Sequence, residues 1–325
     1  MSRNKIGDNL GIAQDRNPPT LPIIELEVKS KEEPFAEILP ISDLKGGSPY
    51  ASEHCANRYL DLAVHNKRIK ILDLGNTISM NDLRSIRGRV LLEKGLLDQR
   101  LLSIAQRLSP VADQICVSVL GDQDAKFNRM FVSTYNWKRE LAAQIGSKPL
   151  IADPLAGVSV IFKVGVNYYS AYIIHAVSRA IINPFTTLNR VRTARMVALT
   201  ISGHRQSISH RFSDFMVVPE NDQGLLQPVL YRAHILLTGG FEKMTPEDEA
   251  QGRPMSTIGT RLIRLGAKAD HPYVVMVDPE TEPNYMKHFY GPNRYRPNKR
   301  FQFQNPGWKN PDNLRVDLRP KEEED

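Results

Sequence analysis

Apolar residues recur along the chain in two patterns, as short runs and as longer stretches with a helical period. The short runs, in which apolar residues alternate with polar ones or are continuous, predict strands over 21–28, 67–74, 115–120 and 158–164. Apolar residues at three- and four-residue spacing predict helices that begin near 52 and 79, and further helices over 97–108, 168–182, 187–201, 208–215 and 225–237. The pattern predicts a mixed α/β fold that is mostly helical.

Proline and polar residues concentrate near the two ends of the chain and suggest three parts. Residues 1–50 are rich in Pro, Asn, Asp and Glu and are expected to form a flexible N-terminal arm. Residues 51–278 are expected to form one globular domain. Residues 279–325 are expected to form an extended tail in which basic residues alternate with aromatic ones before an acidic end. Such a tail either stacks on nucleic-acid bases or is pinned onto the core of the protein itself.

Charge and cysteine content narrow the environment and the partners. The 325 residues carry 43 Lys and Arg against 36 Asp and Glu, a formal charge of +7. This surplus favours a polyanionic partner, although a positive surface without any nucleic-acid role gives the same balance. Two cysteines outside any CxxC pair favour a reducing compartment. With no signal peptide and no apolar stretch of about 20 residues, we expect a bacterial cytoplasmic protein without a membrane partner.

The sequence contains no pattern typical of an enzyme. It lacks the glycine-rich phosphate loops, the GxSxG nucleophile turn and the HExxH zinc motif. His54 and Cys55 are adjacent but have no second ligand pair nearby, so a zinc site is not expected. His204 and His210 can in principle meet Asp214, and the alternative is that both are solvated. We therefore expect no catalytic residue, no metal and no cofactor, and a protein that is not an enzyme.

Residues 67–109 have the length and order of a ribbon–helix–helix unit: a basic–aliphatic strand, then two helices separated by Gly95. In such a unit, strands from two subunits form a ribbon that enters the major groove of DNA. The alternative is an interior strand followed by a helical hairpin, and Asp73 on the aliphatic face departs from the motif. The expected contacts are Arg68 and Lys70 to bases, Thr77, Ser79 and Asn81 to the backbone, and Arg84 and Arg87 to phosphates.

A second basic run lies between 190 and 211, and no acidic residue occurs between Asp153 and Asp214. An uncompensated basic run is suited to phosphate binding, and its alternatives are a solvated face or a surface that receives the acidic tail. The residues predicted to contact phosphates here are Arg190, Arg192, Arg195, Arg205 and Arg211.

Two short motifs add a family resemblance. The segments Tyr168-Tyr-Ser-Ala-Tyr172 and Arg192-Thr-Ala-Arg-Met-Val-Ala-Leu199 resemble a protein family encoded on integrating conjugative elements, over about 160–250, and the chain is similar to AcaB-like regulators of conjugation. The resemblance implies a transcriptional activator of transfer genes, related to ribbon–helix–helix factors. By position it extends only to Arg192 and Arg195, and it implies no particular role for either residue.

Together these observations lead to one hypothesis and one alternative. The hypothesis is a homodimeric transcriptional regulator that binds specific double-stranded DNA, with RNA polymerase as a further partner. The alternative is a structural or accessory nucleic-acid-binding protein, such as a conjugation factor or a viral nucleoprotein, without a role in gene regulation.

Overall fold

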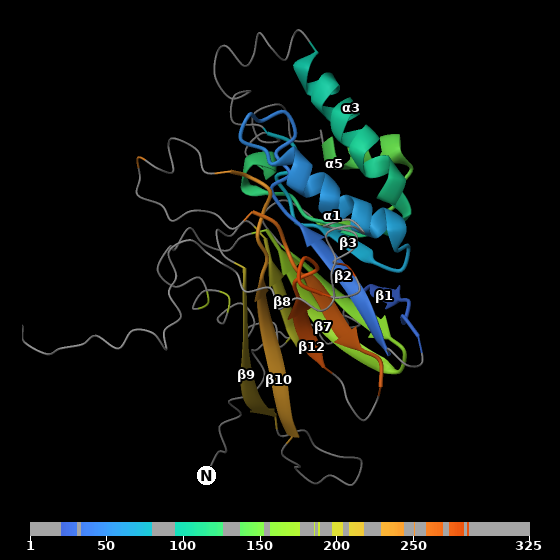
Figure 1. Cartoon of the computed structure of the whole chain (residues 1–325). Helices are drawn as coiled ribbons and strands as arrows, with labels where there is room; N and C mark the ends of the chain where they lie inside the picture. The colour runs from blue at the N-terminus through green and yellow to red at the C-terminus, as the bar shows by residue number, and fades with distance from the viewer. Residues whose placement is uncertain are drawn as a thin grey trace, which may run out of the picture.

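The structure is a computed structural model in which two β-sheets face each other and the helices lie on one side of them (Figure 1). It describes residues 21–30, 34–79, 95–125, 137–152, 157–175, 185, 188, 197–203, 208–217, 229–243, 250, 258–268, 273–282 and 285.

Sheet B is built around four parallel strands. In spatial order it contains β12 (Val274–Val277), β11 (Leu262–Gly266), β2 (Phe35–Ile41), β3 (Lys70–Asp73), β4 (Ile115–Ser118) and β5 (Leu150–Ile151). Strands β2 to β5 run parallel to one another, whereas β11 is antiparallel to both β2 and β12. The connections between the parallel strands return over one face of the sheet, and that is where the helices lie.

Sheet A mixes parallel and antiparallel pairs. In spatial order it contains β1 (Ile23–Leu26), β6 (Val158–Val164), β7 (Asn167–Ile174), β8 (Leu199–Ser202), β10 (Val229–Leu237) and β9 (Ser209–Val217). Strands β7, β8 and β10 run parallel, so their carboxyl ends lie at the same edge of the sheet. The β6–β7 and β9–β10 pairs are antiparallel.

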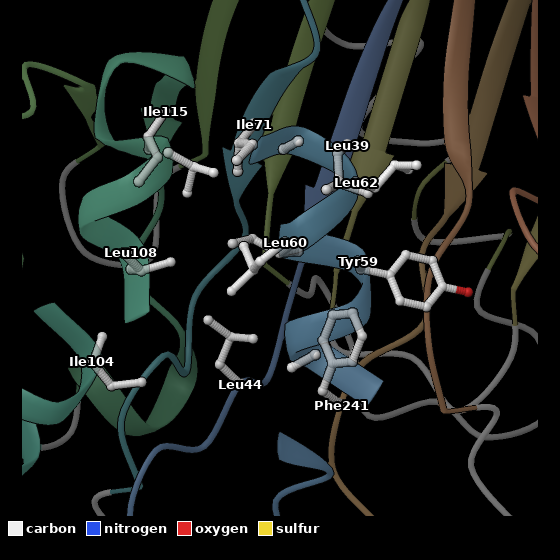
Figure 2. Packing of buried hydrophobic residues seen from close by; sticks show 14 of the residues in the cluster. Leu39, Leu44, Tyr59, Leu60, Leu62, Ile71, Ile104, Leu108, Ile115 and Phe241 are labelled. Carbon is white, nitrogen blue, oxygen red and sulfur yellow. The ribbon is translucent and has the colours of Figure 1, made fainter. Parts of the chain in front are cut away.

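Three apolar clusters hold these layers together. Helices α1 (Glu53–His65), α3 (Leu96–Leu108) and α5 (Trp137–Ile145), with the 3₁₀ turn η2 (Ser109–Gln114), cover one face of sheet B. In Figure 2, Leu60 and Leu62 of α1 lie in the same cluster as Ile104, Leu108 and Ile71. A second cluster fills the space between the sheets, and a third lies against the ends of β7 and β10. Burying one such aliphatic side chain contributes about 1.5–3 kcal/mol, so each layer is stabilised by many of these contributions.

The two sheets show that the expectation of a mostly helical fold is wrong. The segments predicted as helices over 168–182, 208–215 and 225–237 contain strands β7, β9 and β10, and the end of 187–201 is strand β8. The end of β7, β8 and the second half of β10 have continuous buried runs, because neither face of these strands needs polar residues, and such runs resemble a buried helix. Strand β9 is different, since it lies at the edge of sheet A and Phe212 is exposed. Strands β3, β4 and β6 and helices α1 and α3 do occur where the sequence pattern places them.

The ribbon–helix–helix unit is also wrong, because β3 lies inside a sheet. It pairs in parallel with β2 on one side and with β4 on the other, and Ile71 and Leu72 are fully buried. A strand with both edges occupied cannot pair with the same strand of a second subunit, so the ribbon and the homodimer inferred from it have no basis. The helix predicted from Ser79 falls on 80–94, outside the described residues.

The ends of the chain contribute to the core. Strand β2, which belongs to the segment expected to be an arm, is fully buried and central in sheet B. Tyr285, within the expected tail, packs into the cluster beneath α1. The division into 1–50, 51–278 and 279–325 stays a prediction. Within the described residues, no helix has both the length and the apolar character needed to cross a membrane.

Candidate functional site

The carboxyl ends of strands from both sheets meet at one place. The backbone N–H of Asp43, just after β2, donates to the carbonyl of Gly75, just after β3, at 3.0 Å. From sheet A, His175 follows β7 directly, and its Nδ1 lies 2.5 Å from the carbonyl oxygen of Leu74. Gly203, after β8, packs against Ser42 and Leu74 so closely that a Cβ there would overlap them. In α/β sheets, ligands bind beyond the carboxyl ends of the strands, which makes this junction the candidate site.

The side-chain amide of Asn76 lies at the centre of the junction. Its Nδ2 is 2.9 Å from Asp43 Oδ1, 3.0 Å from Asp122 Oδ1 and 3.1 Å from His175 Nε2. These four residues form what we call the Asn76 cluster. An amide nitrogen has two hydrogens, so it cannot donate to all three acceptors at once. The cluster therefore brings two carboxylate oxygens and an imidazole nitrogen to within about one hydrogen-bond length of a single point.

The orientation of His175 is fixed by its second nitrogen. Because a carbonyl oxygen only accepts, Nδ1 must carry the proton that is donated to Leu74. In the neutral ring Nε2 then presents its lone pair toward Asn76, and it lies 3.5 Å from Asp122 Oδ1. A histidine held in this way, with one N–H on a backbone carbonyl, is oriented as histidine metal ligands are.

Asp124 and two glycines hold Asn76 in place. Asp124 is fully buried, and one of its carboxylate oxygens accepts the backbone N–H groups of Asn76 at 2.8 Å and Gly121 at 2.7 Å. Burial raises the pKa of Asp124, and the Lys138 ammonium and the two backbone donors act in the opposite direction. Gly75, with φ +96°, approaches the backbone of Gly121, and a Cβ on Gly121 would overlap the Asn76 side chain. The loops after β3 and β4 can pack this closely only with glycine at both positions.

A buried ion pair lies behind the cluster. The Lys138 ammonium, on α5, contacts Asp73 Oδ2 and lies 2.5 Å from Thr77 Oγ1. Asp73 also accepts hydrogen bonds from Ser118 Oγ at 2.6 Å and from Thr77 Oγ1 at 2.9 Å. Burial alone raises the pKa of Asp73, but the Lys138 charge and these hydrogen bonds lower it by more, so the pKa lies below its ordinary value. This pair locks the ends of β3 and β4 to α5.

A second buried lysine lies near Asp43. Lys45 is 1% exposed, and its ammonium is 3.7 Å from Asp43 Oδ1 and 3.4 Å from Glu242 Oε2. Asp43 Oδ1 is the same oxygen that accepts from Asn76. The two buried lysines therefore lie near different carboxylates, Lys138 near Asp73 and Lys45 near Asp43.

The donor set fits one divalent cation in its chemistry. Two carboxylate oxygens with a neutral imidazole nitrogen are ligands that zinc and manganese accept. Within the described residues, no group of three or more His, Cys, Asp or Glu side chains is placed so that it could hold a metal ion as it stands. The amide nitrogen of Asn76 occupies the point that the three acceptors share. Cation binding at this point requires that amide to turn aside.

Some of the DNA contacts predicted from sequence lie in the described part of the chain. Arg68 donates to the carbonyl of Lys29, and the Lys70 ammonium lies 3.4 Å from the carbonyl of Asp113. Thr77 and Ser79 are buried, and Thr77 binds Asp73. The Arg211 guanidinium lies over the ring of Phe185, 4.1 Å from its centroid. The remaining predicted contacts lie outside the described residues: Asn81, Arg84, Arg87, Arg190, Arg192, Arg195 and Arg205. No observation tests the assignment of these residues to DNA, and it stays a prediction.

The histidines singled out from sequence have other partners. His210 Nε2 lies 2.9 Å from His234 Nδ1, and the two rings are stacked. Asp214, proposed as their carboxylate, instead forms two hydrogen bonds with Arg232, at 2.8 and 3.1 Å. His204 lies outside the described residues.

None of the four residues of the Asn76 cluster was predicted from the sequence as a site residue. A usable signal was present, because Asp43, Asn76 and Asp122 each come shortly after an apolar run that forms a parallel strand of sheet B. Polar residues after consecutive parallel strands meet at one edge of a sheet. That signal needs the strands to be recognised as parallel neighbours, and His175 follows a segment that was predicted to be a helix.

Comparisons with known proteins give structural likenesses only. No family model and no curated protein matches the sequence. A protein from Streptococcus pneumoniae described as a predicted phosphoesterase aligns at 14% identity with a TM-score of 0.34, over 74% of this chain and 88% of its own. Vps29 from Cryptosporidium parvum aligns at 16% identity with a TM-score of 0.34, over 74% and 96%. Zinc-complexed Vps29 from Entamoeba histolytica aligns at 11% identity with a TM-score of 0.32, over 74% and 98%. At these values the likenesses assign no activity to the chain.

These findings correct the functional expectations. Membership of the conjugative-element family has no support from any family model or curated protein, and the structures that align include a predicted phosphoesterase and two Vps29 proteins. The interpretation as a DNA-binding activator is wrong, since its ribbon is an interior strand, and its alternative as an accessory nucleic-acid-binding protein is not supported either. The expected DNA and RNA polymerase partners depended on the same interpretation and lose their basis with it. The expectation of a protein that is not an enzyme has no support in the comparisons either, and one of the structures that align is described as a predicted phosphoesterase.

Proposed function

We propose that the chain is a hydrolase of phosphate esters that works with one divalent cation at the Asn76 cluster. The observation that supports this proposal is the convergence of Asp43 Oδ1, Asp122 Oδ1 and His175 Nε2 on one point. The position supports it too, since the point lies beyond the carboxyl ends of the parallel strands.

The residues of the cluster have separate roles in this proposal. Asp43, Asp122 and His175 would hold the cation, which when bound polarises a phosphoryl oxygen and makes a bound water more acidic. Leu74 keeps the lone pair of His175 directed at the cluster. Asp124 fixes the loops that carry Asn76 and Asp122, so the ligands are positioned before any substrate arrives. The net charge of +7 attracts an anionic ester.

Manganese binding tests the proposal directly. We expect the wild-type chain to bind one Mn²⁺, measured by electron paramagnetic resonance, and Asp122→Asn or His175→Ala to weaken binding by at least about 10- to 100-fold, the effect of losing only a residue that supports a ligand. The matched controls are the exposed residues Asp113 and His65. Asp113→Asn and His65→Ala should bind as the wild type does. Equal manganese binding by all variants, or none by the wild type, would refute the proposed site.

Asn76→Asp should strengthen Mn²⁺ binding, in contrast to the two substitutions above. A carboxylate here adds a third negative charge beside Asp43 and Asp122, so the variant should be less stable than the wild type in a metal-free buffer. With Mn²⁺ present its melting temperature should rise more than that of the wild type, because a better ligand set gives a larger stabilisation by binding. Hydrolysis of p-nitrophenyl phosphate and of bis(p-nitrophenyl) phosphate then distinguishes a monoesterase from a diesterase. A Mn²⁺-loaded chain that cleaves neither would remove the assignment to phosphate esters.

The two cysteines are consistent with the cytoplasmic location that forms part of this proposal. Cys55 and Cys116 are both free thiols, as a reducing compartment favours.

A further inference from the structure

Lys45 is a buried ammonium with no short contact to an acceptor. Its Nζ finds no hydrogen-bond acceptor among the described residues, and its two ion-pair distances, 3.4 Å to Glu242 and 3.7 Å to Asp43, are longer than hydrogen bonds. Buried ammonium groups are normally both paired and hydrogen-bonded, because burial removes the water that would otherwise solvate them. Three N–H donors are therefore held next to the Asn76 cluster without an acceptor at hydrogen-bond distance in that part of the chain.

The backbone holds this side chain inward. Asp43 and Lys45 have φ values of +53° and +49°, in the left-handed region that residues with a Cβ seldom adopt. The turn is fixed by N–H groups of this loop that donate to the loop after β3, from Lys45 to the Asn76 carbonyl at 3.1 Å and from Gly46 to the Thr77 carbonyl at 2.9 Å. The same turn thus presents Asp43 to the cluster and places the Lys45 ammonium beside it.

The two carboxylates around Lys45 differ in their position. Asp43 is buried and shares its Oδ1 with Asn76, so it belongs to the cluster. The Glu242 side chain is 24% exposed, after β10, and is the partner that an entering anion can replace. The ammonium therefore lies between the cluster and a carboxylate that reaches solvent.

We propose that Lys45 is the phosphate-binding residue of this site, and that its ammonium donates to a non-bridging phosphate oxygen in place of Glu242. The inference rests on the proposed hydrolase function and specifies its substrate contact. In sites with two cations, both positive charges act on the same phosphate group. Here the second positive charge is part of the chain, and the ammonium supplies directed hydrogen bonds as well as charge.

Isothermal titration calorimetry with inorganic phosphate, in the presence and in the absence of Mn²⁺, tests this role. Lys45→Met should weaken phosphate binding by about 10- to 100-fold, the usual worth of charge-assisted hydrogen bonds. Glu242→Gln should strengthen phosphate binding by roughly threefold or more, because the competing anion is lost. A purely structural ion pair predicts that the Glu242 variant is weaker or unchanged. Lys67→Met, at an exposed lysine, is the control and should bind phosphate as the wild type does.

The outcomes separate this inference from the function on which it rests. Normal Mn²⁺ binding with unchanged phosphate affinity in Lys45→Met overturns the role of Lys45 and leaves the cation site intact. If the wild type takes up no Mn²⁺ but binds phosphate, and Lys45→Met loses that phosphate binding, the hydrolase function is overturned and the role of Lys45 is supported. If circular dichroism shows that Lys45→Met does not fold, Glu242→Gln decides: tighter phosphate binding supports the inference, and unchanged or weaker binding overturns it.

Discussion

Replacing Lys138 with methionine should destabilise the protein strongly, although the new side chain is similar in length and apolar. The Lys138 ammonium is fully buried and contacts Asp73, which is buried as well. In the variant the Asp73 carboxylate stays in the interior with its hydrogen bonds from Ser118, Thr77 and the Gly75 N–H, but without a compensating charge. The perturbation therefore tests the charge itself rather than the packing of α5.

The size of the effect follows from what remains around Asp73. Removing one partner of a buried ion pair typically costs about 3–5 kcal/mol, because the other charge is left desolvated. Asp73 can escape part of this cost by taking up a proton. Its pKa is lowered in the wild type largely by Lys138, so the variant should have a raised pKa there and a smaller deficit at pH 5 than at pH 7. We expect Lys138→Met to lower the free energy of unfolding by about 3 kcal/mol or more at pH 7.

Urea unfolding monitored by circular dichroism measures the loss, and a double-mutant cycle assigns it. Asp73→Asn in the Lys138→Met background should restore a large part of the stability, with a coupling energy of about 2 kcal/mol or more. The comparison pair is Lys163 and Glu25, which have a 2.8 Å contact at the surface, and Lys163→Met should change stability little. Additive losses at Lys138 and Asp73, or equal losses for the buried and the exposed lysine, would refute the reasoning.

Three further predictions concern the scaffold around the site. Gly121→Ala should weaken Mn²⁺ binding and lower the melting temperature, since its Cβ overlaps Asn76; Gly146→Ala, where nothing lies within 4 Å but φ is +71°, is strained only in its backbone and should leave Mn²⁺ binding unchanged. Burial beside His210 lowers the pKa of His234 to about 4, so its stabilising contribution should be complete above pH 6.5 and lost as the pH falls toward 4. His234→Asn should flatten that part of a melting-temperature profile, and an unchanged profile would contradict it. Gln114→Met should cost about 1–3 kcal/mol in urea unfolding, because the Gln114 Nε2 lies 2.8 to 3.1 Å from three backbone carbonyls around the end of α1 and its two hydrogens can be donated to two of them; no loss would contradict it.

The elements that were predicted correctly have one buried side and one more exposed side, which gives their apolar residues a clear period along the sequence. Helix α3 is buried along one side, and its apolar residues recur at helical spacing, so its bounds are close to those predicted. Strand β6 alternates between buried and half-buried positions and was predicted with the same bounds. Strands β7 and β10 have long buried stretches without alternation, and the pattern could not distinguish them from helices.

The site was missed because its residues depend on long-range pairing. Asp73 is the clearest case, since by pattern alone it is a polar interruption on the aliphatic face of a strand. In the fold it is the partner of Lys138, 65 positions away in the chain. Asn76 and His175 lie 99 positions apart and meet only because β3 and β7 belong to facing sheets. Local propensity contains no term for such contacts.

The charge balance at the junction argues for one cation rather than two. Among the described residues, the carboxyl groups of Asp43, Asp73, Asp122 and Glu242 lie at this junction with the ammonium groups of Lys45 and Lys138, and Asp124, whose pKa burial raises, is left out of the count. Four negative charges then meet two positive ones. One divalent cation balances them, and a second would leave a surplus of two positive charges. An uncompensated charge in the interior is costly. Lys45, Lys138 and one cation together therefore supply the positive charge that the carboxylates require.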